Sequence, residues 1–186
     1  TLLKILHGII LHTSGTINWG EIPVHEVRKK QSMVFQNPIL LNRTTFENIM
    51  YVAKRKNIET NESVDKIIKQ LNLESIINIE SKYLSGGEKQ KVAIAMSIIS
   101  NPKIIFLDEP TSQLDPVYKN EIENIITNLS ENNTKIFMTS HDIAQIDRIG
   151  KEIIFLDDGE IIFHDKVKDF INEKGNSIIR NYVNYG

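Results

Sequence analysis

The chain has 186 residues, of which 40% are hydrophobic and 25% are charged, and its formal net charge is -2. This length and composition favour one globular domain with a buried core, and the weakly negative charge gives no general basis for binding nucleic acid. The sequence contains no cysteine, which excludes disulfides, thiolate metal sites and cysteine nucleophiles, and no apolar run is long enough to span a bilayer.

The beginning of the chain predicts one helix and two strands. Leucine and isoleucine fill most positions of residues 2–10, which predicts a buried helix. No N-cap residue, first-turn acid or loop precedes this segment, so we expect the chain to begin inside a longer protein. Residues 16–19 predict a short strand, and residues 32–35 predict a buried strand that delivers Gln36 to its carboxyl end before Asn37-Pro38 breaks it.

Residues 37–83 are more polar and predict helices. Thr44 and Glu47 have the spacing of a capping box, which predicts a helix from there through about Lys54. A second helix with one buried stripe is predicted by four apolar residues at helical spacing: Val64, Ile67, Ile68 and Leu71. We interpret this region as a helical subdomain inserted between two sheet-forming parts.

The next segment predicts a strand, a helix and a strand. A helix with little polar surface begins at Gly86 and ends before Asn101-Pro102. Residues 104–107 are continuously apolar, as in a parallel strand covered on both faces. Residues 118–129 predict an amphipathic helix, and residues 135–139 predict a second central strand. This succession is typical of a βαβ unit.

The remainder predicts a helix from about Asp142, a hairpin across residues 153–163 with a primed turn at Asp158-Gly159, and two short closing helices. The sequence therefore predicts an α/β fold whose parallel sheet is flanked by helices. We expect one domain with the following parts: a helical subdomain that includes the Gly86 helix at about residues 37–100, and a catalytic core formed by residues 1–36 and 101–186.

Four polar side chains follow predicted strands and are candidates for a site at one edge of the sheet: Gln36, Asp108, Glu109 and His141. An acid after a buried strand is costly unless it faces a cation or hydrogen-bond donors, so we expect Asp108 to hold Mg²⁺ through water. Glu109 is placed to orient or deprotonate a water that attacks a terminal phosphate, and His141 to stabilise charge on the transferred phosphoryl group. Alternatively, the two acids only cap or turn the chain before Pro110.

Two further segments could bind a ligand or only begin helices. Ser85-Gly86-Gly87 at a helix start offers unblocked backbone N–H groups and the positive end of the helix dipole, although a Gly-Gly pair alone usually marks a turn. Asp115 before Pro116 is either an ordinary N-cap or a functional residue, and both interpretations stay open.

As a set, these motifs resemble those of ABC-type ATPases. Leu84-Ser85-Gly86-Gly87-Glu88 is similar to the signature motif, and residues 104–108 with Glu109 resemble the Walker B strand and the catalytic glutamate. Gln36 resembles the Q-loop glutamine, residues 112–115 resemble the D-loop, and His141 resembles the switch histidine. The order and spacing of the motifs match over essentially the whole chain.

The resemblance implies a P-loop NTPase-like fold and a subunit that binds and hydrolyses ATP with Mg²⁺, held by Asp108 and Gln36. Members of the family dimerise head to tail around two ATP molecules. Ser85, Gly86 and Gly87 would therefore serve the γ-phosphate bound by a second copy of the chain, and Glu88 and Asp115 would also be nucleotide-binding residues.

The resemblance also implies a location and a partner. The helical insert and the segment after Gln36 would receive a transmembrane permease subunit, so the protein would lie peripherally at the cytoplasmic face of the cell membrane, with no nucleic-acid partner. The residues around Gln36 and Asn48-Ile49 are similar to those of bacterial importers of oxyanions such as tungstate, molybdate or phosphate. The full transporter would then include a solute-binding protein.

The sequence departs from the family pattern at its start. The Walker A loop, Gly-x-x-x-x-Gly-Lys-Ser/Thr, does not occur in it, and Thr1-Leu2-Leu3 resembles the residues that follow this loop, with Thr1 still able to reach a phosphate. Lys91 and Met96 replace arginines that are common after the signature. We therefore expect the isolated chain to bind nucleotide poorly and to hydrolyse nothing.

Two alternative functions stay open. The first is a soluble ABC-type machine that acts on DNA or the ribosome, which is disfavoured by the single set of motifs and the lack of coiled-coil heptads. The second is a non-hydrolysing, nucleotide-gated scaffold, which is disfavoured by the intact Glu109 and His141.

Overall fold

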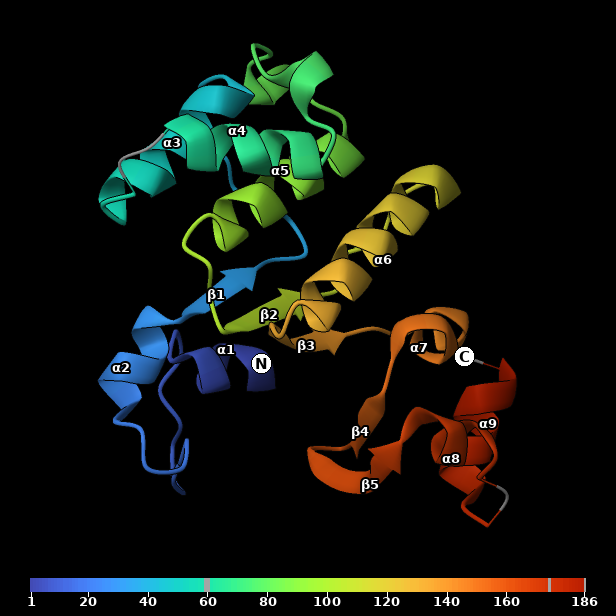
Figure 1. The fold of residues 1–186 in the computed structure, drawn as a ribbon. Coiled ribbons are helices and arrows are strands. Elements are labelled where there is room, and N and C mark those ends of the chain that lie inside the picture. The colour runs from blue at the N-terminus through green and yellow to red at the C-terminus, as the bar shows by residue number, and fades with distance from the viewer. Residues whose placement is uncertain (59–60, 174, 186) are drawn as a thin grey trace. The chain divides into compact units, whose positions relative to one another are not determined.

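The structure, a computed structural model, describes residues 1–58, 61–173 and 175–185 (Figure 1). The chain forms two compact units, Thr1–Thr139 and Ser140–Gly186, and the predicted helical subdomain lies within the first. The first unit contains these helices and strands: α1 (Leu2–His7), α2 (Val24–Lys29), β1 (Gln31–Val34), α3 (Thr45–Arg55), α4 (Asn61–Gln70), η1 (Glu74–Ile76), η2 (Ser81–Tyr83), α5 (Gly86–Ile98), β2 (Ile104–Asp108), α6 (Pro116–Glu131) and β3 (Lys135–Thr139).

A parallel sheet of three strands in the order β1-β2-β3 organises the first unit. The side chains at the centre of β2 are buried, as expected for a parallel strand covered on both faces: Ile105, Phe106 and Leu107. The register pairs Val34 with Leu107 and Asp108 with Thr139, so the three strands end at the same edge. The prediction of β3 as a second central strand is wrong for the described sheet, where it is the edge strand and most of its side chains are half-exposed.

Helices lie on both faces of this sheet, with α5 and α6 on one face and α1 and α2 on the other (Figure 1). Most positions of α5 are buried, which explains why its sequence shows so little polar surface. The prediction of a buried helix over residues 2–10 is wrong. The helix ends at Gly8, whose φ of 87° lies in the left-handed region, and none of the residues of α1 is buried.

The predicted strand at residues 16–19 is also wrong. These residues form neither a helix nor a strand, and they pair with none of the described strands. Alternation of side chains cannot by itself form a strand, because the backbone N–H and C=O groups need a neighbouring strand to pair with.

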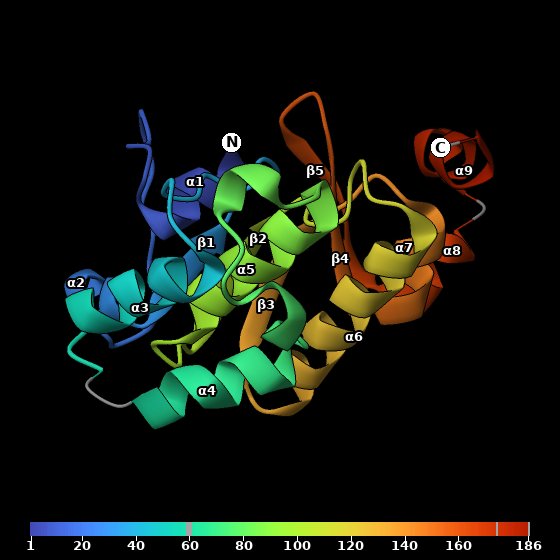
Figure 2. The ribbon, with the colours of Figure 1, turned by 90° about the horizontal axis from the view of Figure 1, so that it is seen from above.

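The helical region of the first unit matches its predicted pattern. Thr44 and Glu47 form a capping box at the start of α3, with both reciprocal hydrogen bonds present. The predicted apolar stripe is buried, with Val64, Ile67 and Ile68 in α4 and Leu71 directly after it. Figure 2 shows α3, α4 and α5 lying next to one another in this unit.

The second unit contains α7 (Ile143–Ile149), β4 (Glu152–Asp157), β5 (Glu160–Lys166), α8 (Val167–Ile171) and α9 (Ser177–Tyr185). The predicted hairpin is confirmed, since β4 and β5 pair antiparallel and both turn residues, Asp158 and Gly159, have positive φ angles. Phe170 contacts the rings of Phe155 and Phe163 and is fully buried, which makes it the centre of this small core. None of the described helices in either unit is long and apolar enough to cross a bilayer.

Candidate active site

One hydroxyl group, that of Thr139 at the end of β3, bonds both the Asp108 carboxylate and the backbone of Glu109 at the end of β2. The Thr139 hydroxyl donates to Asp108 Oδ1 over 3.0 Å and accepts from the backbone N–H of Glu109 over 2.9 Å. Glu109 has a φ of 46°, a left-handed conformation that is uncommon for a residue with a side chain. The hydrogen bond that the Glu109 N–H donates to Thr139 therefore stabilises a strained turn directly after β2.

Gln36, just beyond β1, reaches the same point. Its Nε2 atom donates to Glu109 Oε2 over 3.0 Å and to Ser112 Oγ over 3.1 Å. The Ser112 hydroxyl in turn donates to the backbone carbonyl of Glu109 over 3.0 Å. Gln36, Asp108 and Glu109 thus converge at the edge where the sequence predicts them.

A cation already lies beside the second oxygen of Asp108. The Lys4 ammonium of α1 is 3.7 Å from Asp108 Oδ2, and the two side chains are 35% and 25% exposed. Thr1 precedes α1 at its N-cap position and is exposed. The carboxylate oxygens of Asp108 and the amide oxygen of Gln36 are hard ligands of the kind that Mg²⁺ prefers, so the donor set at this edge fits that ion.

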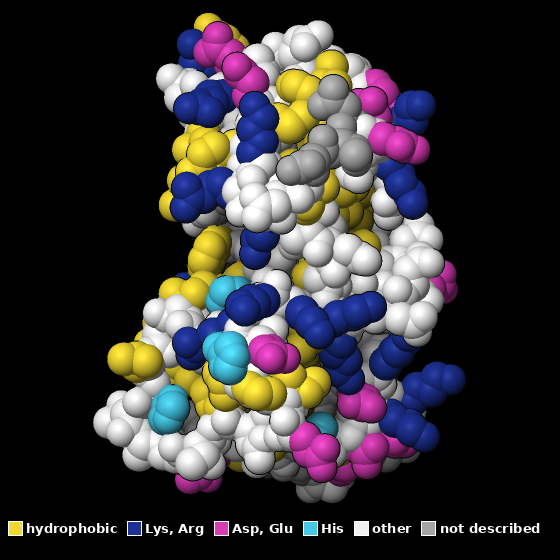
Figure 3. Space-filling model, turned by 60° about the vertical axis from the view of Figure 1, so that its left-hand side comes forward, with side chains coloured by type: hydrophobic (Ala, Val, Ile, Leu, Met, Phe, Trp, Pro, Cys, Tyr) yellow, Lys and Arg dark blue, Asp and Glu magenta, His cyan; other side chains and the backbone are white. Residues whose placement is uncertain are grey.

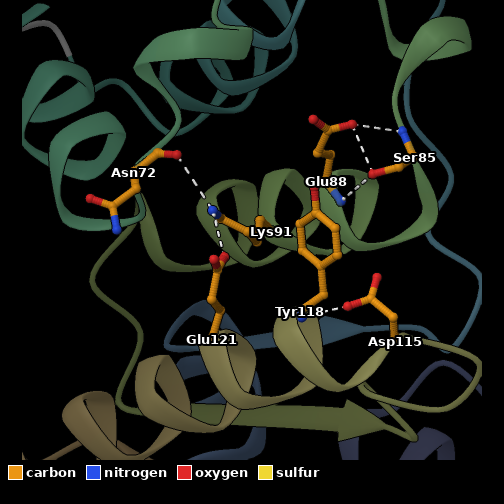
Figure 4. Close-up of polar contacts among 7 residues, drawn as sticks. All are labelled: Asn72, Ser85, Glu88, Lys91, Asp115, Tyr118 and Glu121. Carbon is orange, nitrogen blue, oxygen red and sulfur yellow. Dashed lines mark hydrogen bonds and ion pairs between the residues drawn. The ribbon is translucent and has the colours of Figure 1, made fainter.

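The signature segment forms the start of α5 (Figure 4). Glu88 Oε2 accepts from both the backbone N–H and the hydroxyl of Ser85 over 2.8 Å, and Ser85 Oγ accepts from the Glu88 N–H over 3.3 Å. Ser85 and Gly86 are exposed, whereas Gly87 is buried. The positive end of the helix dipole therefore lies at an exposed point of the chain, but the capping box occupies the N–H groups of Ser85 and Glu88 and holds the Glu88 carboxylate there.

Asp115 begins α6, and the structure shows its capping role directly. Its Oδ1 atom accepts from the backbone N–H groups of Val117 and Tyr118 over 2.9 and 3.1 Å. A second, functional role for Asp115 stays a prediction. His141 is exposed in the second unit, just before α7, so its role stays a prediction as well.

Three residues of the cluster were not among the predicted site residues, namely Lys4, Ser112 and Thr139. Thr139 could have been found by aligning β2 and β3 from their first residues, since this register pairs it with Asp108. Ser112 belongs to the segment that resembles a D-loop, but a serine in a turn is common, and the sequence does not indicate which residues it hydrogen-bonds.

The profile of the family described as ABC transporter matches residues 1–112, which is more than half of the chain. The chain belongs to the ABC transporter family. ABC ATPases bind ATP with Mg²⁺ and generally hydrolyse ATP.

Individual relatives agree with this assignment. The phosphate import ATP-binding protein PstB of Mycoplasmoides gallisepticum is 31% identical over 184 residues, which is 95% of this chain and 56% of that protein. The tungstate uptake system ATP-binding protein TupC of Peptoclostridium acidaminophilum is 34% identical over 165 residues, which is 87% of this chain and 77% of that protein. The chain thus spans only about half of the length of the first relative and about three quarters of the second.

A solved structure shows the same fold. The structure of cbiO1 from Clostridium perfringens, part of the ABC transporter complex cbiONQ, superposes with a TM-score of 0.78 at 26% sequence identity. The match covers 97% of this chain and 76% of that chain. The predicted α/β fold with a parallel sheet and flanking helices is therefore confirmed as that of an ABC ATPase.

Proposed function

We propose that the full-length protein carrying this sequence is the ATP-hydrolysing subunit of a bacterial importer. The observation that carries the proposal is the convergence of Gln36, Asp108 and Glu109 at the edge of the parallel sheet. Open α/β sheets bind ligands outside the carboxyl ends of their strands, and this cluster has the carboxylates and the amide that phosphoryl transfer needs.

In this proposal each predicted site residue has its own task. Asp108 and Gln36 hold Mg²⁺, which supplies positive charge to the phosphates. Glu109 orients the attacking water and accepts its proton, and its position is set by the bonds from Gln36 and Thr139. His141 donates to the transferred phosphoryl group, and Thr1 contacts a phosphate of the nucleotide bound by its own chain.

A second copy of the chain completes the nucleotide site, in a head-to-tail homodimer. The first turn of α5, with Ser85, Gly86, Gly87 and Glu88, faces the γ-phosphate held by the partner, and Asp115 lies in the same interface. Support comes from the exposed residues Ser85 and Gly86 at the start of a 13-residue helix, where the helix dipole favours an anion.

The proposed membrane partner is a transmembrane permease subunit that docks on the helical region, with the protein lying peripherally at the cytoplasmic face. Large apolar side chains are exposed around α3 and η2: Ile39, Leu41, Tyr51, Ile79 and Tyr83. Arg43 and Arg55 each lie with Cζ 5.8 Å from the Tyr51 ring centroid. The upper part of Figure 3 shows hydrophobic side chains exposed between basic ones in this region.

The proposed solute is an oxyanion, delivered by a solute-binding protein in the full transporter, and nucleic acid is not a partner. Two relatives have names that specify phosphate import and tungstate uptake, which supports this choice. We further propose that the 186-residue chain alone does not turn over ATP, because its sequence contains no Walker A loop.

The test is ATP turnover by the purified full-length protein, measured alone and with candidate partners. The proposal expects stimulation by the permease encoded beside its gene, reconstituted in lipid vesicles. Stimulation by DNA or ribosomes with none by the permease would favour a soluble ABC-type machine instead. Tight ATP binding without turnover under any of these conditions would favour the non-hydrolysing scaffold.

A further inference from the structure

The helices α5 and α6 begin in the two segments that the proposed dimer presents to its partner. The signature residues Ser85 and Gly86 start α5, and Asp115 caps α6. How these two segments sit relative to each other depends on how the two helices are joined. Figure 4 shows two contacts between the helices, one helical turn apart.

The first contact joins the first turns of the two helices. The Tyr118 ring projects from α6 toward the start of α5 (Figure 4). A Cβ atom at position 87 would overlap the ring atoms Cγ, Cδ1 and Cδ2. Real Cβ atoms do not approach other atoms that closely, and these ring atoms are not the far end of a flexible chain. The packing of Tyr118 therefore requires a glycine at position 87, whether or not this residue contacts a phosphate.

The second contact is an ion pair one turn further along each helix. Lys91 Nζ lies 3.0 Å from Glu121 Oε2 and donates to the backbone carbonyl of Asn72 over 3.4 Å. The Lys91 side chain is 8% exposed, whereas that of Glu121 is 41% exposed. A lysine is rarely buried to this degree unless it is paired, because the desolvated ammonium is costly without acceptors. Lys91 thus connects α5 to α6 and to the end of α4.

From these contacts we infer that Gly87, Lys91, Tyr118 and Glu121 form a clamp that positions the signature segment relative to the Asp115 segment. The clamp makes Lys91 and Glu121 positioning residues for the site offered to a second copy of the chain, although neither side chain touches the nucleotide. This inference rests on the proposed function, since it concerns the site that the partner copy uses. The clamp explains why a charged residue, Lys91, is buried at a position where an apolar side chain could also pack.

The experiment uses the full-length protein carrying Glu109→Gln, in which the proposed function expects ATP to bind without turnover. Analytical ultracentrifugation gives the dissociation constant of the ATP-dependent dimer, and a fluorescent ATP analogue gives nucleotide affinity under conditions where the protein is monomeric. Adding Lys91→Met should weaken dimerisation roughly tenfold, the effect of losing one hydrogen bond to a charged group. Nucleotide affinity of the monomer should change less than about twofold, since its own site is intact.

Three further variants separate positioning from general stability. Lys91→Arg keeps the charge and should restore dimerisation. Glu121→Gln breaks the ion pair at a half-exposed position, so it should weaken dimerisation even if Lys91→Met does not fold. Val92→Ala removes a buried side chain next to Lys91 in α5 and should lower stability while leaving the dimer constant unchanged.

The outcomes distinguish failure of the proposed function from failure of the clamp. If the parent protein forms no dimer with ATP, the proposed function fails, and the inference fails with it. If the parent dimerises and both Lys91→Met and Glu121→Gln dimerise as tightly, the clamp is refuted while the proposed function stands. The clamp is equally refuted if Val92→Ala weakens the dimer as much as Lys91→Met does.

Discussion

Gln36 Nε2 donates to Glu109 Oε2 over 3.0 Å, which joins the end of β1 to the turn after β2. The same nitrogen atom donates to Ser112, whose hydroxyl holds the Glu109 backbone carbonyl. One amide group therefore orients both the side chain and the turn of the proposed general base. In the proposed function, a substitution of Gln36 would therefore change the rate of ATP hydrolysis in two ways, through the position of Glu109 and through the binding of the metal ion.

Replacing Gln36 by leucine removes the donor at similar size. We expect kcat for ATP hydrolysis by the full-length protein to fall about tenfold or more, since a bond to a charged group is worth about 1.5–3 kcal/mol. Phosphate release at saturating ATP and Mg²⁺ measures it. Gln70→Leu, at an exposed position of α4, is the matched control and should leave kcat unchanged. Equal kcat values for both variants would contradict the role of Gln36.

Thr139→Val tests the hydroxyl that bonds the Asp108 carboxylate and the Glu109 backbone N–H. The valine has nearly the same shape but cannot donate to Asp108 or accept from the Glu109 N–H. We expect kcat to fall about tenfold and the Mg²⁺ concentration for half-maximal rate to rise, because Asp108 and the left-handed Glu109 both lose a restraint. Thr139→Ser keeps the hydroxyl and should stay within about threefold of the parent. A serine variant as slow as the valine variant would argue against this hydrogen-bonding role.

Glu88→Gln removes a negative charge from the first turn of α5. In the proposed dimer this carboxylate lies beside the partner's γ-phosphate, so its neutral isostere should tighten ATP-dependent dimerisation by several-fold, about 1 kcal/mol in Coulomb energy. The chain offers a close control in Glu47→Gln, which changes the same position of the capping box of α3. Glu47→Gln should affect stability alone. Unchanged or weaker dimerisation by Glu88→Gln would count against a phosphate at this turn.

His7 predicts a pH dependence of stability. Its ring lies with centroids 5.8 Å from the buried Phe106, and burial, followed by the charges of Arg28 and Lys56, lowers the pKa of His7 below the usual 6.5. The unfolded chain therefore binds a proton more readily than the folded one, so stability should fall as pH drops below that value.

Urea unfolding of the full-length protein at about pH 7.5 and about pH 5.5 measures this effect. His7→Gln should lose less stability between the two conditions than the parent protein. His12→Gln, at an exposed position, serves as the control and should behave like the parent. Identical losses for the parent and His7→Gln would show that another group sets the acid sensitivity.

Local sequence signals were enough to predict helix starts and turns that are formed by residues close together in the sequence. The capping box of Thr44 and Glu47 and the primed turn at Asp158-Gly159 involve neighbours in sequence, and both formed as predicted. The convergence of Gln36, Asp108 and Glu109 was also predictable, because parallel strands of one sheet end at the same edge.

Contacts between distant segments were not predictable in the same way. Residues 2–10 are apolar enough for burial, but what covers a helix is decided by other segments, and Gly8 ends this one early. The need for glycine at position 87 comes from the Tyr118 ring, which lies on a different helix. Likewise, nothing in the sequence pairs Lys91 with Glu121, since either could have been an ordinary exposed charge.

The central claim is that Glu109 acts as the general base of an ATP-hydrolysing subunit. The most direct measurement is phosphate release by the full-length protein and its Glu109→Gln variant at saturating ATP and Mg²⁺, together with their affinity for ATP. The account predicts that kcat falls about 100-fold or more while ATP stays bound, because the amide cannot accept the proton of the attacking water. Turnover by Glu109→Gln at the parent rate would contradict the account.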